Sequence, residues 1–337
     1  MKKLLAIVLA ALLLACAAVA LAEDASPMEI KVLIMPKFES GEMAGDFPGE
    51  AQYYYEAYLQ GGETYEVTGC SEPLYVKDGV ALMLAGMGKV NAAFSLQAVL
   101  NDTRFDFSNA YIISTGCAGS AVEYGVMGDV FVITATIDFD LGHHADARDL
   151  VSDVETTWFH DKSYDSFAYN LLNQDLCDKI YEMVKDVKLE TTDRTRNFMA
   201  VSFDNAEWAT RDPQVLRGTT VTADNYWKGY YDHNNALLMA ETYGAPDPYA
   251  LTEMEDNAMS MVLSRLGMLD RFIVIRDSVN TDVFMNGACP ESLWDDDFKQ
   301  SLASESNVES ADIFATAMKN NFAVGSVVVD AILNGEL

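Results

Sequence analysis

The chain has 337 residues, half of them hydrophobic, and a formal net charge of −30 at pH 7. Such an acidic protein repels polyanions, and no basic stripe offsets the charge, so nucleic acid and anionic lipid surfaces are excluded as favoured partners. After residue 22 no stretch approaches the roughly 18 to 20 consecutive apolar residues of a spanning helix, which excludes a pore formed by this chain alone.

The N-terminus has the pattern of a secretory signal peptide over residues 1–22. Two lysines precede an apolar run, and the small residues Ala20 and Ala22 stand directly before two acids. We expect cleavage after Ala22 and export of the mature chain, 23–337, with no transmembrane segment. An alternative is lipid attachment at Cys16, but the residues after it are apolar, where a solvated tether would be expected.

Short apolar runs rich in strand formers alternate along the mature chain with segments whose apolar residues recur every three to four positions. This alternation predicts one α/β domain with a mixed, largely parallel central sheet flanked by helices, and ligands of such sheets bind where strands end. Expected strands cover 30–35, 80–84, 111–113, 130–134, 199–203, 219–222 and 272–275. Expected helices begin near 48 and cover 89–101, 164–188, 232–243, 252–266 and 307–334.

Two glycine-containing turns follow expected strands. The turn at Gly86-Met87-Gly88 leads into a helix and lets backbone approach a ligand closely, with an ordinary glycine turn as the alternative. The second turn, STGCAGS over 114–120, partly matches a nucleophile elbow with Cys117 as the nucleophile. The alternative is a small buried cysteine in a close-packed turn. Four cysteines follow residue 22, and their spacing leaves disulfide pairing open.

The segment 138–146 gathers three aspartates and two histidines within nine residues. Carboxylate and imidazole ligands at this density are compatible with a divalent metal ion. Against a metal site, His143 and His144 are adjacent on one backbone, and the helical spacing of paired metal-binding histidines is absent from the sequence. We therefore expect no metal and keep a metal-dependent hydrolase as a weaker alternative.

Two polar segments late in the chain, TEMEDNA (252–258) and FIVIRDSVNTD (272–282), complete a set of motifs with TGCAGS and GDVFVITA. Together these motifs resemble the nucleoside phosphorylase and nucleosidase superfamily. The stretches PKFESGEMAGDFPGEAQYYYE, GMGKVNAA and VTADNYWKG resemble its purine nucleoside permease branch in particular. The resemblance runs in one order through nearly all of the mature chain, and it implies a single-domain nucleoside phosphorylase-like fold over 23–337.

The resemblance implies a purine nucleoside as the small-molecule ligand. Glu255 would accept hydrogen bonds from the two vicinal ribose hydroxyls, with Met254 packed on the sugar. Tyr226 and Trp227 would stack on the base, for which core packing is the alternative role. The alternative is that Glu253, Glu255 and Asp256 form a solvated helix start. The expected substrate-binding set is completed by Gly116, Asn280 and Asp282.

The resemblance also implies cleavage of the N-glycosidic bond. Asn280 stands where many members have aspartate, and an amide donates a hydrogen bond but gives up no proton, so Asp277 and Asp282 are neighbouring candidates for acid catalysis. Glu39 or Glu42 lies near the place of the water-activating carboxylate of nucleosidases. The loop that contains these glutamates has no arginine to hold phosphate. The catalytic candidates are therefore Glu39, Glu42, Asn280 and Asp277.

These interpretations lead to one main hypothesis, an exported purine nucleoside-binding protein that hydrolyses the glycosidic bond rather than phosphorolysing it. The alternative from another class is a non-catalytic nucleoside-binding component of uptake, which the permease name suggests. No cofactor is expected. The resemblance also implies a homo-oligomer, in which the loop 138–146 completes a neighbour's pocket.

Overall fold

The computed structural model describes residues 26–150, 154–284 and 296–337, with the side chains of 296–311 outside this description. The expected signal peptide, Cys16 and Cys289 lie outside the described residues. The described cysteines at 70, 117 and 177 are free thiols. Among the helices of the described ranges, none combines the length and apolar character that crossing a membrane requires.

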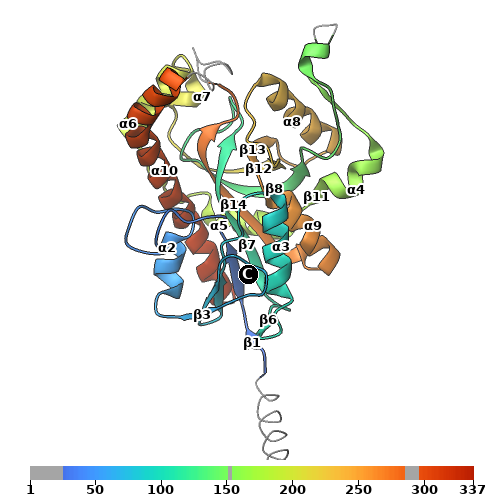
Figure 1. The fold of residues 1–337 in the computed structure, drawn as a ribbon, viewed down its shortest axis with the longest axis vertical. Coiled ribbons are helices and arrows are strands. Elements are labelled where there is room, and N and C mark those ends of the chain that lie inside the picture. Colours follow the sequence, from blue (N-terminus) through green and yellow to red (C-terminus); the bar gives the residue numbers. More distant parts are fainter. Residues whose placement is uncertain (1–25, 151–153, 285–295) are drawn as a thin grey trace, which may run out of the picture.

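One large mixed sheet forms the centre of the molecule (Figure 1). Its order is β11-β8-β12-β13-β7-β2-β5-β4-β3, and β14 pairs with both β7 and β8. The strands are β2 (Val32–Met35), β3 (Glu63–Tyr65), β4 (Leu74–Lys77), β5 (Val80–Leu82), β7 (Tyr111–Ser120), β8 (Val130–Asp138), β11 (Tyr169–Leu171), β12 (Val215–Thr222), β13 (Tyr249–Glu253) and β14 (Phe272–Thr281). Two separate pairs are β1 (Met28–Glu29) with β6 (Phe105–Asp106), and β9 (His143–His144) with β10 (Trp158–Phe159).

Two parallel groups of strands form the centre of the sheet, and β11 at one end and β4 and β3 at the other are added antiparallel. Strands β5, β2, β7 and β14 pair in parallel, as do β8, β12 and β13. The groups meet antiparallel twice, at β13 with β7 and at β14 with β8, so β7, β14, β8, β12 and β13 form a closed cycle of paired strands. The predicted mixed α/β sheet is confirmed.

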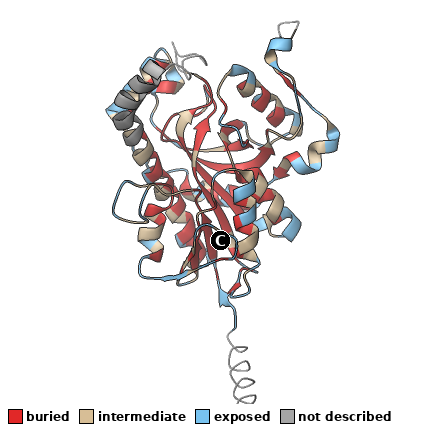
Figure 2. Ribbon diagram, in the orientation of Figure 1, coloured by how far each residue is buried: buried red, intermediate tan, exposed pale blue. Residues whose placement is uncertain are grey.

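Helices cover both faces of the sheet because its strands are apolar on both sides. In β2, Leu33 belongs to the core under α3 and α9, whereas Val32 and Ile34 belong to the core under α5 and α10. Figure 2 shows the buried strands between these layers. The helices are α2 (Gln52–Tyr54, continued as a π-helical segment to Leu59), α3 (Lys89–Leu100), α4 (Asp165–Ala168), α5 (Gln174–Val184), α6 (Asp193–Ser202), α7 (Glu207–Thr210), α8 (Tyr230–Tyr243), α9 (Asp256–Leu266) and α10 (Asp296–Leu333).

Two expected elements are wrong. The expected strand 199–203 lies almost entirely in α6, which Thr192 caps and which buries Thr195, Met199 and Ser202 at helical spacing. A short apolar run does not distinguish a strand from one face of a helix. The expected helix 164–188 is divided into α4 and α5 by β11, which pairs antiparallel with the edge of β8.

Candidate functional site

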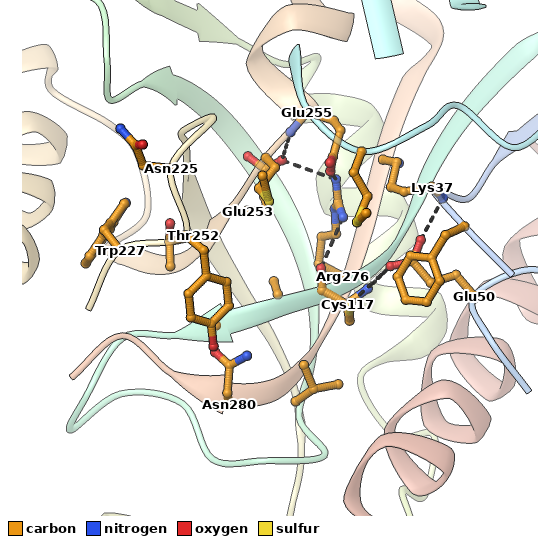
Figure 3. A pocket seen from close by; sticks show the side chains of 17 residues that line it. Lys37, Glu50, Cys117, Asn225, Trp227, Thr252, Glu253, Glu255, Arg276 and Asn280 are labelled. Atoms are coloured by element: carbon orange, nitrogen blue, oxygen red, sulfur yellow. Dashed lines mark hydrogen bonds and ion pairs between the residues drawn. The ribbon is translucent and has the colours of Figure 1, made fainter. Parts of the chain in front are cut away.

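A pocket lies where the carboxyl ends of β2, β12 and β13 meet the second halves of β7 and β14 (Figure 3). Glu50 and Lys37 lie at one end, and Asn225 and Trp227 lie at the opposite end. The pocket thus presents a carboxylate at one end and amide and aromatic groups at the other. Its lining consists of Lys37, Phe38, Glu50, Met87, Cys117, Ala118, Gly119, Asn225, Tyr226, Trp227, Thr252, Glu253, Met254, Glu255, Arg276, Val279 and Asn280.

The structure brings together half of the residues that the sequence singled out. Those that line the pocket are Met254, Glu255, Tyr226, Trp227 and Asn280. Those that do not line it are Gly116, Glu39, Glu42, Asp277 and Asp282. The second group lies behind the pocket wall or in the loop before α2, and each member has contacts that explain its place.

Two glycines of β7 make room for polar side chains of the site. Gly116 has φ +136°, and a Cβ there would overlap the Glu50 carboxylate. A Cβ at Gly119 would overlap the Oδ1 atom of Asn280. The small-residue motif of β7 therefore allows two functional groups to approach the strand, and Gly116 acts through Glu50.

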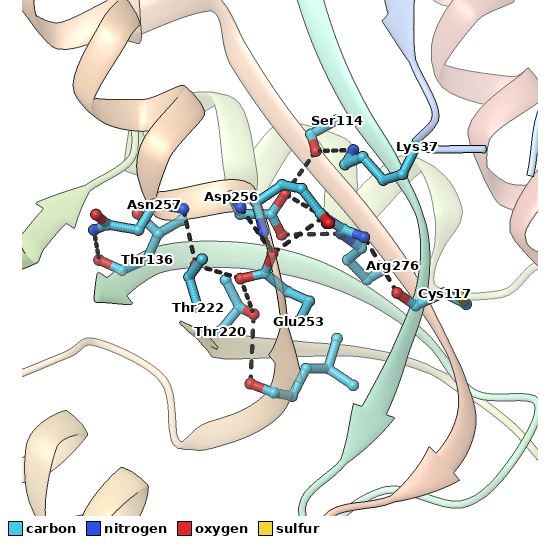
Figure 4. Close-up of polar contacts among 12 residues, drawn as sticks. Lys37, Ser114, Cys117, Thr136, Thr220, Thr222, Glu253, Asp256, Asn257 and Arg276 are labelled. Atoms are coloured by element: carbon cyan, nitrogen blue, oxygen red, sulfur yellow. Dashed lines mark hydrogen bonds and ion pairs between the residues drawn. The ribbon is translucent and has the colours of Figure 1, made fainter. Parts of the chain in front are cut away.

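Arg276 forms the electrostatic centre of the pocket wall (Figure 4). Its Nη2 atom lies 3.2 Å from Glu253, 3.0 Å from Glu255 and 2.8 Å from Asp256. Burial opposes its charge, but these carboxylates outweigh burial and raise the pKa of Arg276 well above its usual value. Glu253 also accepts from the backbone N–H groups of residues 255 and 256, at 2.6 and 2.7 Å, which fixes the start of α9.

Glu255 is held from two sides. The Gly88 N–H donates to its Oε1 at 2.9 Å, and Arg276 donates to its Oε2 at 3.0 Å. Gly88 begins α3 with φ 89°, so the glycine turn noted in the sequence brings a backbone donor to this carboxylate. Each oxygen keeps acceptor capacity for a ligand hydroxyl.

Lys37 is a second buried cation, and its three donors are already used. Its Nζ donates to the Met35 carbonyl at 2.7 Å, to Ser114 Oγ at 2.8 Å and to the Thr115 carbonyl at 3.2 Å. Burial, with Arg276 next in importance, lowers the pKa of Lys37. Lys37 and Arg276 are the only cationic side chains in the described lining of the pocket. All three donors of Lys37 and most donors of Arg276 bond protein groups.

Glu50 is the functional candidate that the sequence reasoning missed. Its Oε1 accepts from the Cys117 N–H at 2.9 Å, and its Oε2 accepts from the Lys37 N–H at 2.6 Å. Burial raises the pKa of Glu50, while Lys37 and Arg276 act in the opposite direction. Glu50 lies in the segment PKFESGEMAGDFPGEAQYYYE, and its spacing in the sequence does not distinguish it from the other acids of that segment.

Glu39 supports Glu50 from outside the pocket. Its Oε2 accepts from the N–H groups of Ala51 at 3.0 Å and Gln52 at 2.7 Å, and its Oε1 accepts from the Gly49 N–H. These donors flank Glu50 in sequence, so Glu39 fixes the backbone from which Glu50 projects. Glu42 is exposed, and its own N–H donates to Asp46 at 3.0 Å.

We expect Glu39→Gln to reduce turnover of a nucleoside, the ligand that the family resemblance implies, by about 10- to 100-fold, because small displacements of a reacting group are costly. The new amide would face backbone donors that now bond a carboxylate. The measurement is kcat and KM for base release. An unchanged kcat would show that the Glu50 backbone does not depend on Glu39.

The two aromatic candidates have different environments. Trp227 is 9% exposed and stacks on Phe139 with ring centroids 5.0 Å apart and an interplanar angle of 19°. Core packing, the alternative left open by the sequence, is therefore part of its role. Tyr226 is 68% exposed and lines the pocket, so it is free to cover a ligand.

Asp282 lies behind the site and joins three segments. Its Oδ1 accepts from the Val122 N–H at 3.0 Å, and its Oδ2 is 2.7 Å from His233 Nδ1 and 2.9 Å from the Tyr249 hydroxyl. These contacts fasten the end of β14 to the first turn of α8. They leave Asp282 engaged in structural bonds, two residues beyond Asn280.

Cys117 lies inside β7 rather than at a strand-to-helix turn, which removes the nucleophile-elbow geometry. Its Sγ donates to Glu50 Oε1 at 3.1 Å. Burial, followed by the charge of Glu50, raises the pKa of the thiol well above its usual value, so the unreactive protonated form is favoured.

The two histidines of the segment 138–146 have separate partners. His143 Nε2 is 3.2 Å from Asp161, and His144 Nε2 is 2.7 Å from the Phe139 carbonyl. Within the described residues there is no group of three or more His, Cys, Asp or Glu side chains arranged to hold a metal ion.

Comparison with known proteins identifies the family of the chain. Residues 29–336 match the family model described as purine nucleoside permease. The chain belongs to the purine nucleoside permease family. A probable purine nucleoside permease from Schizosaccharomyces pombe is 28% identical over 227 residues, which cover 60% of this chain and 64% of that relative. The match therefore spans less than two thirds of the length of this relative.

This purine nucleoside permease family member is also similar to nucleosidases. A 5'-methylthioadenosine/S-adenosylhomocysteine nucleosidase from Bacillus pumilus is 28% identical over 220 residues, covering 65% of this chain and 76% of that enzyme. The solved structure of such a nucleosidase from Neisseria meningitidis, in complex with methylthio-immucillin-A, has a TM-score of 0.53 at 16% identity and covers 89% of this chain and 99% of its own. The likeness establishes the nucleoside phosphorylase-like fold that the sequence predicted.

Proposed function

We propose that the chain binds a purine nucleoside in this pocket and hydrolyses its N-glycosidic bond. The observation that carries the proposal is the Glu50 carboxylate, buried in the pocket wall at the end opposite Asn225 and Trp227. A nucleoside placed with its base at the aromatic end and its sugar at Glu255 directs C1′ toward Glu50. Glu50 takes over the water-activating role that the sequence assigned to Glu39 or Glu42.

The charges of the wall favour the transition state of this reaction. Cleavage develops positive charge on the sugar, and electrostatic preorganisation toward such charge is a major source of catalysis. Glu255, Asp256 and ionised Glu50 outnumber the cations Arg276 and Lys37. Burial raises the pKa of Glu253 to about 7, so Glu253 adds only part of a charge near neutral pH. An excess of buried negative charge stabilises an oxocarbenium-like sugar.

The same charges argue against phosphate as the nucleophile. Phosphate needs donors that are free to bind it, as arginine and lysine donors do elsewhere. Here all three donors of Lys37 and most donors of Arg276 bond protein acceptors, and the surplus of carboxylates repels an anion. Water carries no charge and needs only an acceptor for its proton.

The chemical step uses three side chains of the pocket. Glu50 accepts a proton from water as the water oxygen bonds C1′, and the electron pair of the C1′–N9 bond leaves with the purine. The Asn280 amide donates a hydrogen bond to the departing base, which takes its proton from solvent. Glu255 holds the ribose hydroxyls during the step.

The test of the proposal is release of free base from inosine, guanosine or adenosine by the purified protein, with and without added phosphate. We expect release that does not depend on phosphate. Absence of cleavage under both conditions would remove the enzymatic function. Dependence on phosphate would replace hydrolysis by phosphorolysis.

The family supports a second candidate function, a non-catalytic nucleoside-binding component of uptake. Its specific support is Asn280, which lines the pocket but has no proton to give to a leaving base. Calorimetry that shows tight nucleoside binding without turnover would favour this function. Failure to bind any purine nucleoside would reject both functions.

Glu255→Ala is expected to weaken nucleoside binding by roughly 2 to 4 kcal/mol, because the vicinal hydroxyls lose a charged acceptor. The fold is expected to persist, since Arg276 keeps its bonds to Glu253 and Asp256. Isothermal titration of the variant against the unchanged protein measures the difference. Equal affinity would place the sugar elsewhere in the pocket.

We further propose that the mature chain is exported after removal of residues 1–22. Cell fractionation and the N-terminal sequence of the recovered protein test this. An N-terminus at Glu23 supports the proposal, whereas a lipid-modified Cys16 supports membrane anchoring instead. Light scattering of the same material tests the homo-oligomer that the resemblance implied.

A further inference from the structure

Asp277 is a carboxylic acid sealed behind the pocket wall, one residue after Arg276. It is 0% exposed, and its Oδ1 accepts from Asn321 Nδ2 of α10 at 2.8 Å. Its Oδ2 is buried and has no hydrogen-bond partner among the described residues. An ionised oxygen left in this state is costly, whereas a protonated carboxyl has a hydrogen to donate.

Asp277 lies beside Glu50 because of strand register. Asp277 of β14 and Cys117 of β7 are register partners in a parallel pair, so their side chains project from the same face. Glu50 Oε1 bonds both the N–H of Cys117, at 2.9 Å, and its Sγ, at 3.1 Å. Asp277 and Glu50 therefore both lie near Cys117 on one face of the β7–β14 pair, where the charge of Glu50 acts on Asp277.

No cation pairs with Asp277 among the described groups that face it. On its own strand, the Arg276 guanidinium is bonded to Glu253, Glu255 and Asp256 on the other side of the wall. The other groups that face Asp277 are Cys117 from β7, Glu50 from the loop before α2, Tyr54 from α2 and Asn321 from α10. Burial, followed by the charge of Glu50, raises the pKa of Asp277 to about 7.

We propose that Asp277 and Glu50 form a buried carboxyl pair that holds a single proton in the active protein, with Asp277 as the positioning residue that keeps the proton. The inference rests on the proposed hydrolysis. With Asp277 neutral, Glu50 is the ionised member and accepts the proton of the attacking water. The pair then holds two protons, and one returns to solvent when the free base and sugar leave.

The pair predicts a bell-shaped dependence of kcat on pH. At low pH both carboxyls are protonated, and Glu50 accepts no proton from water. As pH rises through the pKa of Asp277, its proton is lost, and two adjacent charges disrupt the geometry of Glu50. The value of kcat therefore falls at low pH and at high pH, and the fall at high pH, the alkaline limb, reports loss of the proton from Asp277.

The test is Asp277→Asn, which mimics the neutral acid and keeps the acceptor for Asn321. We expect base release to persist and its alkaline limb to disappear, while the acidic limb remains. An alkaline limb identical to that of the unchanged protein overturns the inference. Absence of base release by the unchanged protein at every pH rejects the proposed hydrolysis instead, so the two failures are distinguishable.

Asp282→Asn is the matched control, since Asp282 is equally buried and follows on the same stretch of chain. Its oxygens already have the donors Val122 N–H, His233 and Tyr249. We expect this variant to lose stability without losing the alkaline limb. Disappearance of the limb in both variants would indicate a general structural effect and would also overturn the inference.

Thermal unfolding gives a readout that needs no activity. A carboxyl whose pKa is higher in the folded than in the unfolded state contributes stability that is present at low pH and is lost as pH rises. The Tm of the unchanged protein is therefore expected to fall through about pH 7 more steeply than that of Asp277→Asn. If the variant does not fold, infrared spectroscopy of Glu253→Gln decides, because burial also raises the pKa of Glu253 to about 7. A protonated carboxyl near neutral pH in that protein supports the pair, and its absence contradicts the pair.

Discussion

Glu50→Gln is expected to reduce the rate of nucleoside cleavage by about 10²- to 10⁴-fold, the contribution typical of a general base. Glutamine has the shape of glutamate, but it accepts no proton from water. It keeps an acceptor oxygen for only one of the N–H groups of Cys117 and Lys37, which now bond separate oxygens of Glu50. The measurement is single-turnover release of free base, combined with calorimetric binding of the uncleaved nucleoside. We expect the rate to fall and binding to persist.

Glu42→Gln is the matched control for this change. Glu42 lies in the same loop but is exposed and does not line the pocket, so its variant is expected to cleave at the rate of the unchanged protein. A full loss of activity in this control, with activity kept in Glu50→Gln, would return the catalytic role to the residue that the sequence first suggested. Equal activity of the unchanged protein, Glu50→Gln and Glu42→Gln would mean that neither glutamate activates the water.

Arg276→Met is expected to lower the free energy of unfolding by at least about 3 to 5 kcal/mol, the usual cost of removing one partner from a buried ion pair. Arg276 is 1% exposed, and its loss leaves Glu253, Glu255 and Asp256 facing one another without a countercharge. Equilibrium urea denaturation at neutral pH measures the effect. We also expect the loss to shrink at lower pH, where the carboxylates take up protons.

Arg265→Met provides the comparison for Arg276. Arg265 is exposed near the end of α9, and surface substitutions of this kind usually change stability by less than about 0.5 kcal/mol. If Arg276→Met unfolded at the same urea concentration as this control, the carboxylate cluster would not depend on the guanidinium.

The sequence predicted those strands that can be recognised from a local apolar run and from the polar loop that follows it. Apolar runs followed by polar loops identified β2, β7, β8, β12 and β14, and the rule that ligands bind at strand ends pointed to the edge of the sheet where the pocket lies. Glu255 and Asn280, 25 positions apart in the printed numbering, do line one pocket. Their roles in binding and cleavage stay predictions.

The sequence did not predict the position of a side chain where its neighbours come from distant segments of the chain. Three glutamates stand between β2 and α2, and composition does not reveal that Glu39 binds backbone, Glu42 faces solvent and Glu50 enters the pocket. That choice depends on Gly116, which leaves space for Glu50 in another strand. The burial of Asp277 depends likewise on the register of β14 with β7 and on α10.

The closed cycle of strands β7, β14, β8, β12 and β13 limits how substrate preference can change. Because each of these strands is paired on both sides, the floor of the pocket does not widen by separating one strand from its neighbour. The positions free to vary are Phe38, Asn225 and Tyr226, which lie in the loops at 36–50 and 223–229 and leave the contacts of Glu50 unchanged. Engineering a different leaving group therefore belongs in these two loops, on a scaffold that stays constant.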